Sequence, residues 1–189
     1  MVIEKTLVVI KPDGVVRSLV GEIISRFEKT GLKIIAMKMV WADETLAKKH
    51  YVLDEAWARG VYEKAKKKYE EEKKLFKYKD HMEYGGMIQQ YNSSFLQEGP
   101  VIALVLEGPH AIEIVRKMVG TTEPRQASPG TIRGDLAMIE SYELSNNKNR
   151  VLRNLIHASD SKESANREIA LWFTPKEIHS YKKDLDKHF

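Results

Sequence analysis

The sequence predicts one domain in which α-helices cover a β-sheet, and three observations support this. Segments typical of strands and helices alternate along the chain, beginning with the apolar, β-branched run 6–10 and a helical pattern over 19–27. Residues 101–106 form a continuous apolar run, as expected of a central strand that is buried on both faces. The 189 residues suffice for a single core that buries roughly 70% of the unfolded surface. By pattern alone, a split βαβ sandwich and a parallel α/β sheet fit equally well.

The composition is that of an ordinary globular protein, with 42% hydrophobic and 31% charged residues. There is no cysteine, which excludes disulfides and suits a reducing cytoplasm. The amino-terminal segment 1–14 is typical of a strand and a turn, not of a signal peptide, and no apolar run approaches the about 18 residues of a membrane span. The net charge of +4 is modest and spread among Lys and Glu neighbours, so it favours anionic ligands without requiring a nucleic acid.

The first half of the chain is expected to contain two strands and several helices. A Pro-Asp-Gly turn ends strand 6–10, and Ser18 precedes a helix that ends near Gly31. Residues 32–40 are expected to form a second, largely buried strand, and Asp43 begins another helix.

The segment 62–80 is dense in Lys and Glu, which indicates a solvated helix. A basic patch that contacts RNA is the alternative, although the acidic residues offset the lysines. Residues 82–95 resume an apolar helical periodicity, which Gly99 and Pro100 interrupt.

In the second half, Pro109 is expected at the first position of a helix, and residues 120–130 form a loop of functional length. Residues 136–144 are expected to form a fourth strand, followed by a polar turn over 145–150. Ser161 is expected to cap the last full helix.

His157 is the leading candidate for a reactive side chain. It follows the apolar residues Leu155 and Ile156 and precedes Ala158, Ser159 and Asp160. A neutral imidazole is a nucleophile toward phosphorus near neutral pH. A histidine that merely packs with a satisfied ring N–H is the alternative. The upstream basic and hydroxyl residues favour the reactive interpretation, because together they form an anion-binding set. They are Arg116, Thr122 and Arg133.

Four polar residues have both a structural and a functional interpretation. Lys11 at the end of the first strand is either a solvated rim charge or a cation that reaches a phosphate. On local evidence His50 and Tyr51 are packing and surface groups rather than catalysts. Arg133 either binds phosphate through its planar fork or pairs with a nearby acid, Asp135 or Glu123.

Taken together, several motifs resemble the nucleoside diphosphate kinase family, in family order from residue 5 to about residue 175. No single motif is as specific as the set. The matching segments are Lys11 to Gly14, His50 and Tyr51, Gly120 to Pro124, Pro129 to Asp135, Asn154 to Ser161, Glu163 to Ala165, Glu168 and Ile169, and Leu171 to Phe173.

The resemblance implies an α+β fold, a ferredoxin-like βαββαβ sandwich in which helices cover an antiparallel sheet. It implies a single kinase domain over 1–189 that transfers the γ-phosphoryl group from a nucleoside triphosphate to a nucleoside diphosphate. The implied mechanism is ping-pong through a phosphohistidine, and His157 matches the nucleophile.

The same resemblance assigns roles to the surrounding residues. Glu168 matches the acid that orients the other ring nitrogen of the histidine, and Ser159 matches a support for that pair. Four residues match the surroundings of the transferred phosphate and the ribose: Lys11, Tyr51, Arg133 and Asn154. Arg116 and Thr122 match the β-phosphate side, and Val151 matches an apolar wall for the base.

The implied cofactor is Mg²⁺, held mainly by nucleotide phosphates, because no His or carboxylate cluster with metal-ligand spacing is evident in the sequence. The chain also lacks a G-x-x-x-x-G-K-[ST] loop, which excludes a P-loop kinase. The expected partners are nucleoside tri- and diphosphates and further copies of the chain, in a cytoplasmic homo-oligomer without a membrane.

Two insertions depart from the family pattern, near 55–95 and 136–151, and the second is expected to form a hairpin. The phenylalanine that stacks on the base in the family has no clear counterpart; Trp57, Tyr62 and Phe76 are candidates. Two rival functions remain at this point: a non-catalytic binding module on the same fold, and a phosphocarrier that serves a protein partner.

Overall fold

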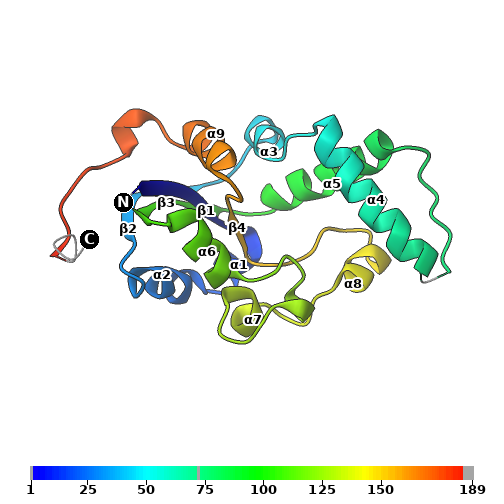
Figure 1. Ribbon diagram of the computed structural model, residues 1–189, viewed down its shortest axis with the longest axis horizontal. Coiled ribbons are helices and arrows are strands. Elements are labelled where there is room, and N and C mark those ends of the chain that lie inside the picture. Colours follow the sequence, from blue (N-terminus) through cyan, green and yellow to red (C-terminus); the bar gives the residue numbers. More distant parts are fainter. Residues whose placement is uncertain (1, 72, 185–189) are drawn as a thin grey trace.

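The computed structural model describes residues 2–71 and 73–184. Within this part, one antiparallel sheet has the strand order β2-β3-β1-β4 (Figure 1). Its strands are β1 (Ile3–Ile10), β2 (Lys33–Val40), β3 (Val101–Pro109) and β4 (Ile156–Ala158). This topology is the ferredoxin-like α+β sandwich, so the parallel-sheet alternative is wrong.

Helices cover both faces of the sheet, which explains the continuous apolar runs in the two central strands. In β1, Val8 and Ile10 pack with α2 and α6, whereas Leu7 and Val9 pack with α3, α5 and α9 on the opposite face. Because successive strand residues point to opposite faces, both sets must be apolar. The helices are α1 (Pro12–Val16), α2 (Val20–Glu28), α3 (Glu44–His50), α4 (Glu55–Glu71), α5 (His81–Leu96), α6 (Ala111–Val119), α7 (Ile132–Leu136), α8 (Tyr142–Asn147) and α9 (Lys162–Trp172), with 3-10 turns η1 (Pro124–Gln126) and η2 (Pro175–Glu177).

The expected strand over 136–144 and the expected hairpin of the second insertion are both wrong. A loop follows α7, and helix α8 occupies the end of the predicted strand. Ser141 caps this helix, since its side chain accepts a hydrogen bond from the Leu144 backbone. Two apolar residues that made the pattern strand-like, Met138 and Ile139, are exposed in the loop. The fourth strand is instead β4, which contains His157.

Other element boundaries also differ from expectation. β3 continues through Pro109, and α6 starts only after His110, whose backbone is left-handed (φ 52°). Ser18 is not a helix cap, because α2 begins after Leu19. β2 is an edge strand and not largely buried, since Met37 and Met39 are 57% and 62% exposed. The helix expected to begin at Asp43 is confirmed, with Asp43 as its N-cap, and the cap at Ser161 is confirmed.

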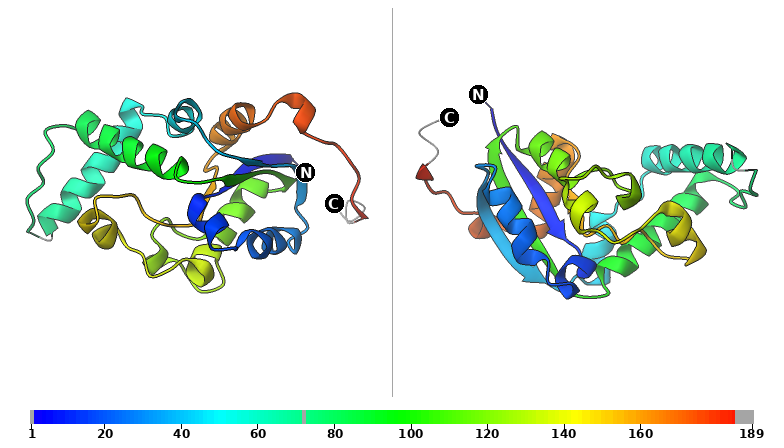
Figure 2. Two further views of the ribbon diagram at one scale, coloured as in Figure 1. Left: turned by 180° about the vertical axis from the view of Figure 1, so that it is seen from behind. Right: turned by 90° about the horizontal axis from the view of Figure 1, so that it is seen from below.

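The two segments interpreted as insertions lie at the same end of the molecule. Helices α4 and α5 form a hairpin that projects from the sheet, and α8 projects beside it (Figures 1 and 2). α4 buries only Ala58, in agreement with a largely solvated Lys- and Glu-rich helix. Among the described helices, none has the length and apolarity to cross a membrane.

Candidate functional site

A cavity of about 640 Å³ runs from the end of the sheet to the two projecting segments. The structure brings most of the sequence-derived candidates to its wall, although they come from six separate parts of the chain. Those on the wall are Lys11, Tyr51, Arg116, Thr122, Arg133, Val151, Asn154, His157 and Glu168. Ser159 lies behind this wall, where it is fully buried.

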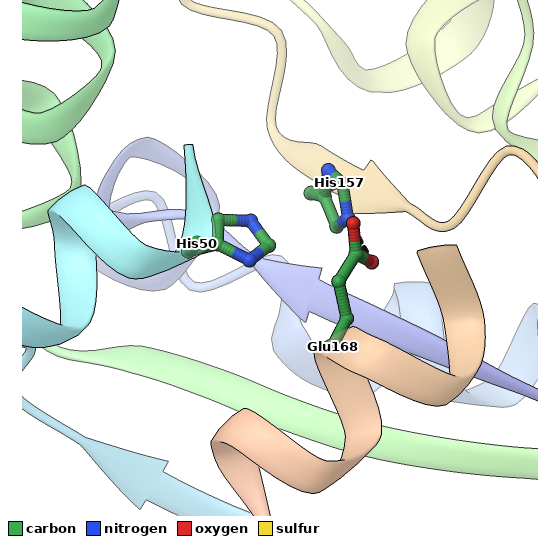
Figure 3. Close-up of side chains that lie close together, drawn as sticks. All are labelled: His50, His157 and Glu168. Atoms are coloured by element: carbon green, nitrogen blue, oxygen red, sulfur yellow. Dashed lines mark hydrogen bonds and ion pairs between the residues drawn. The ribbon is translucent and has the colours of Figure 1, made fainter. Parts of the chain in front are cut away.

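Among the described residues, His157 has a hydrogen-bond partner at one ring nitrogen only. Its Nε2 lies 2.8 Å from Oε2 of Glu168, and that same oxygen accepts a hydrogen bond of 2.7 Å from the Ser159 hydroxyl. Arg167 donates to the other oxygen of Glu168 at 3.2 Å. A carboxylate in such a position is an acceptor, so Nε2 of His157 carries the proton and Nδ1 keeps a lone pair. Figure 3 shows the second ring nitrogen directed away from Glu168.

Lys11 and Asn154 form a buried pair beside this histidine. The Lys11 ammonium donates to Oδ1 of Asn154 at 2.8 Å, and the Asn154 amide donates to the Thr122 carbonyl at 2.9 Å. Lys11 is only 5% exposed, so it is not a solvated charge at the rim of the sheet. Burial, and then the nearby Arg133 guanidinium, lower the pKa of Lys11 to about 7.

Arg133 holds two backbone segments together and also places a positive charge on the cavity wall. Its guanidinium donates to four backbone carbonyls: Asn154 at 3.1 Å, Ile156 at 2.6 Å, Gly120 at 2.9 Å and Thr121 at 3.1 Å. These bonds tie the loop after α6 to the segment that carries His157. The alternative pairing with Asp135 or Glu123 is wrong, because Asp135 pairs with Arg26, and Glu123 accepts from Tyr142 and Gln126.

Tyr51 presents a hydroxyl that is ready for a ligand. This oxygen is buried and has no hydrogen-bond partner among the described residues, although Tyr51 lines the cavity. Burial, and then the Glu168 carboxylate, raise the pKa of Tyr51, so the hydroxyl keeps its proton and is a donor. An unsatisfied buried donor is costly, and a phosphate oxygen would satisfy it.

Comparison with known proteins shows the family to which the chain belongs. The profile of the family described as nucleoside diphosphate kinase matches residues 4–178. The chain belongs to this family. A nucleoside diphosphate kinase of Pyrobaculum aerophilum is 46% identical over 94% of this chain and 99% of its own length, and one of Pyrococcus furiosus is 45% identical over 97% and 91%.

Solved structures of the family share the fold. A crystal structure of an NDP kinase from Pyrobaculum aerophilum superimposes with a TM-score of 0.90 at 44% identity, covering 95% of this chain and 100% of that one. The Borrelia burgdorferi enzyme, solved as a transition state mimic with bound vanadate and ADP, gives a TM-score of 0.82 at 40% identity and covers 98% and 96%. The chain is therefore a nucleoside diphosphate kinase, an enzyme that acts on nucleotides.

Asp13 also supports the site of this kinase, although it is not among the site residues expected from the sequence. Asp13 accepts backbone hydrogen bonds from Gly14 and Leu155, both at 3.1 Å. Leu155 has a left-handed backbone (φ 66°), which is strained for leucine. Asp13 thus holds a strained turn two residues before His157. The sequence feature that could have indicated this role is the position of Asp13 in the Lys11 to Gly14 motif.

The structure also brings together a group that the sequence pattern did not indicate. One nitrogen each of His50 and His157 and one oxygen of Glu168 lie within 4.8 Å of one another (Figure 3). Mg²⁺ takes oxygen ligands, and two imidazoles do not suit it. The group is therefore a poor magnesium site.

Of the three aromatic residues considered for base stacking, only Trp57 lines the cavity. Tyr62 and Phe76 instead contact each other, with ring centroids 5.2 Å apart, inside the α4–α5 hairpin. Other aromatic residues of the projecting segments reach the cavity wall: Tyr69, Tyr84, Tyr91 and Tyr142.

The lowered pKa of Lys11 predicts proton uptake when the kinase binds a nucleotide. With a pKa of about 7, Lys11 of the free enzyme is largely neutral at pH 8, and phosphate oxygens stabilise its charged form. Affinity for ADP should therefore fall by up to about tenfold per pH unit above 7. Calorimetry at pH 8 in two buffers with different ionisation enthalpies should detect an uptake approaching one proton. Lys11→Met should abolish the uptake, and an equal heat in both buffers for the wild-type enzyme would contradict the prediction.

Proposed function

We propose that the enzyme transfers the γ-phosphoryl group from a nucleoside triphosphate to a nucleoside diphosphate by a ping-pong mechanism, through a phosphohistidine at Nδ1 of His157. The observation that carries the proposal is the one-sided fixation of His157. Glu168 occupies Nε2 at 2.8 Å, and the ring lies on the wall of a cavity that is also lined by the basic side chains of Lys11, Arg116 and Arg133. A nucleophile whose free nitrogen is oriented in this way suits phosphoryl transfer.

In the first half-reaction, the lone pair on Nδ1 forms a bond to the γ-phosphorus. The bond from that phosphorus to the β–γ bridging oxygen breaks, and its electrons leave with the nucleoside diphosphate. In the second half-reaction, a terminal oxygen of another diphosphate attacks the same phosphorus, and the electrons of the N–P bond return to His157.

Stabilisation of negative charge is the main task of the surrounding residues in phosphoryl transfer. Lys11, Arg116 and Arg133 supply positive charge on the cavity wall, and the Tyr51 hydroxyl supplies a neutral donor. Asn154 and Thr122 line the same wall and suit contacts with ribose or phosphate oxygens. The vanadate and ADP bound to the Borrelia burgdorferi enzyme support a phosphate-binding role for the equivalent cavity here.

Mg²⁺ is the proposed cofactor, and the donor chemistry fits an ion that arrives on the nucleotide. The carboxylates near the site already accept protein hydrogen bonds: Asp13 from two backbone amides, and Glu168 from His157 and Ser159. Phosphate oxygens and water would hold the ion, with the exposed carboxylate of Asp160 on the cavity wall as a water-mediated partner. When bound, it neutralises charge on the phosphates.

Two features favour a nucleotide enzyme over a phosphocarrier or an inert binding module. A phosphocarrier that serves a protein needs no ribose or base contacts, whereas this cavity extends past Asn154 to Val151 and Trp57. An inert module does not need Glu168 and Ser159 to be buried and aligned behind His157.

Exchange kinetics test the mechanism. A ping-pong enzyme should exchange label between ATP and ADP with no other nucleotide present, and double-reciprocal plots with two nucleotides should give parallel lines. A sequential mechanism with direct transfer would give intersecting lines. Intersecting lines together with the absence of ATP–ADP exchange would overturn the proposed intermediate.

We also propose that the enzyme is a homo-oligomer. β2 lies at the edge of the sheet, and next to its exposed methionines Trp41 is 65% exposed. Exposed apolar edge strands are common sites of association. Light scattering at micromolar concentration should report a mass of at least two chains, and Met39→Lys should shift the population toward monomer. A monomeric wild-type protein would contradict this prediction.

A further inference from the structure

His50 lies against the proposed nucleophile. It is the last residue of α3, it is 3% exposed, and its ring centroid is 4.4 Å from that of His157 at an interplanar angle of 79°. Figure 3 shows the edge of the His50 ring turned toward His157, with Glu168 beside His157. Edge-to-face contacts of this kind are attractive and favour one mutual orientation of the two rings.

The tautomer of His50 follows from its partner. The indole Nε1 of Trp172 lies 3.2 Å from Nδ1 of His50, and an indole N–H can only donate. Nδ1 is therefore the acceptor, and in the neutral ring the proton is on Nε2. Burial lowers the pKa of His50 well below its ordinary value, and repulsion from the charged forms of His157, Lys11 and Arg167 lowers it further, so the ring is neutral.

This arrangement leaves a buried Nε2–H with no hydrogen-bond partner among the described residues. Such a donor costs stability, and a histidine selected for packing alone would not be expected to keep it. It also argues against a metal site, because His50 has no free lone pair while Trp172 donates to Nδ1. The residue is better explained by its contact with His157.

We propose that His50 is a positioning residue for phosphoryl transfer: its ring, locked in one tautomer by Trp172, holds the plane of His157 so that Nδ1 faces the cavity. This inference rests on the proposed function of His157. Glu168 restrains one nitrogen of the nucleophile but leaves the ring free to tilt about that hydrogen bond. The His50 ring, whose centroid lies 4.4 Å from that of His157, removes this freedom. Misplacement of a reacting atom by about 1 Å can cost about a hundredfold in rate.

Single-turnover phosphorylation by labelled ATP tests the proposal on the full-length enzyme. His50→Ala should lower the rate at saturating ATP by about 10- to 100-fold and change the Kd for ADP by less than about threefold, because it leaves the phosphate contacts intact. His50→Phe keeps a ring edge and should restore part of the rate. It also keeps the volume of the site, so it serves if the alanine variant does not fold. The control is His179→Ala, an exposed histidine, with the wild-type rate expected.

Nitrogen NMR of the ring supplies a readout that a merely structural role would not move. In the wild-type enzyme, Nδ1 of His50 should have the shift of an unprotonated acceptor at neutral and alkaline pH, and Trp172→Phe should mix the two tautomers and slow phosphorylation. An unchanged rate in folded His50→Ala, or a loss confined to ADP affinity, would refute the positioning role. Absence of label on wild-type His157 would instead refute the proposed function.

Discussion

His157→Ala should abolish nucleotide exchange and remove the acid-labile phosphoenzyme, with a loss of about 10⁴-fold or more. The expectation follows from the geometry, because His157 supplies the proposed N–P bond. No described neighbour offers an equivalent nucleophile on that wall, since His50 is neutral and its Nδ1 is occupied by Trp172. Labelled ATP, followed by gel separation under alkaline conditions, measures the intermediate directly.

The fold should survive this substitution. His157 lies in the short strand β4, paired with Val9, and its side chain is 21% exposed. Glu168 would keep its hydrogen bonds from Ser159 and Arg167, so it would not be left without a partner. A folded His157→Ala protein that still exchanged phosphate at the wild-type rate would refute the assignment, and His179→Ala provides the matched control.

Arg133→Ala is expected to damage both stability and catalysis. The four carbonyls that accept from the guanidinium would lose charge-assisted hydrogen bonds, which should lower the free energy of unfolding by about 3 kcal/mol. For a chain of this size, that corresponds to a fall in Tm of about 6 to 12 °C. Removing a cation from the cavity wall should also lower turnover per folded molecule by about 10² to 10³.

Arg133→Lys separates these two contributions. Lysine keeps the charge but has three donors and no planar fork, so it cannot reproduce four carbonyl contacts. Relative to Arg133→Ala, the lysine variant should recover part of the turnover rate and a smaller part of the free energy of unfolding. Arg26→Ala is a suitable control, because Arg26 forms surface ion pairs with Glu22 and Asp135, and its loss should cost less than about 1 kcal/mol with no change in rate. A lower Tm of Arg133→Ala without any loss of turnover per folded molecule would show that the role of Arg133 is structural only.

The sequence predicted the sheet core and the residues at the cavity because those features depend on local pattern and motif. Continuous apolar runs located β1 and β3, and both strands are buried on two faces. The motif residues converge because the ends of β1, α3 and β4 meet at one cavity. The family resemblance, and not periodicity, decided between an antiparallel and a parallel sheet.

The remaining features depend on contacts between residues far apart in the sequence. The segment 136–144 is strand-like by pattern, but the Ser141 cap and the Arg150–Glu140 ion pair stabilise a loop and a helix. The carbonyl acceptors of Arg133 have no sequence signature, because they are backbone groups. His50 was interpreted as a packing residue, and the hydrogen bond from Trp172, 122 positions away, gives it a defined tautomer.

The central claim is that Nδ1 of His157 is the nucleophile while Glu168 holds Nε2, and the position of phosphorylation tests it most directly. Alkaline denaturation of the phosphoenzyme, digestion and phosphorus NMR against authentic phosphohistidine isomers would identify the modified nitrogen. The account predicts phosphate on Nδ1 of His157. Phosphate on Nε2 would require the 2.8 Å contact with Glu168 to break, and it would contradict the account.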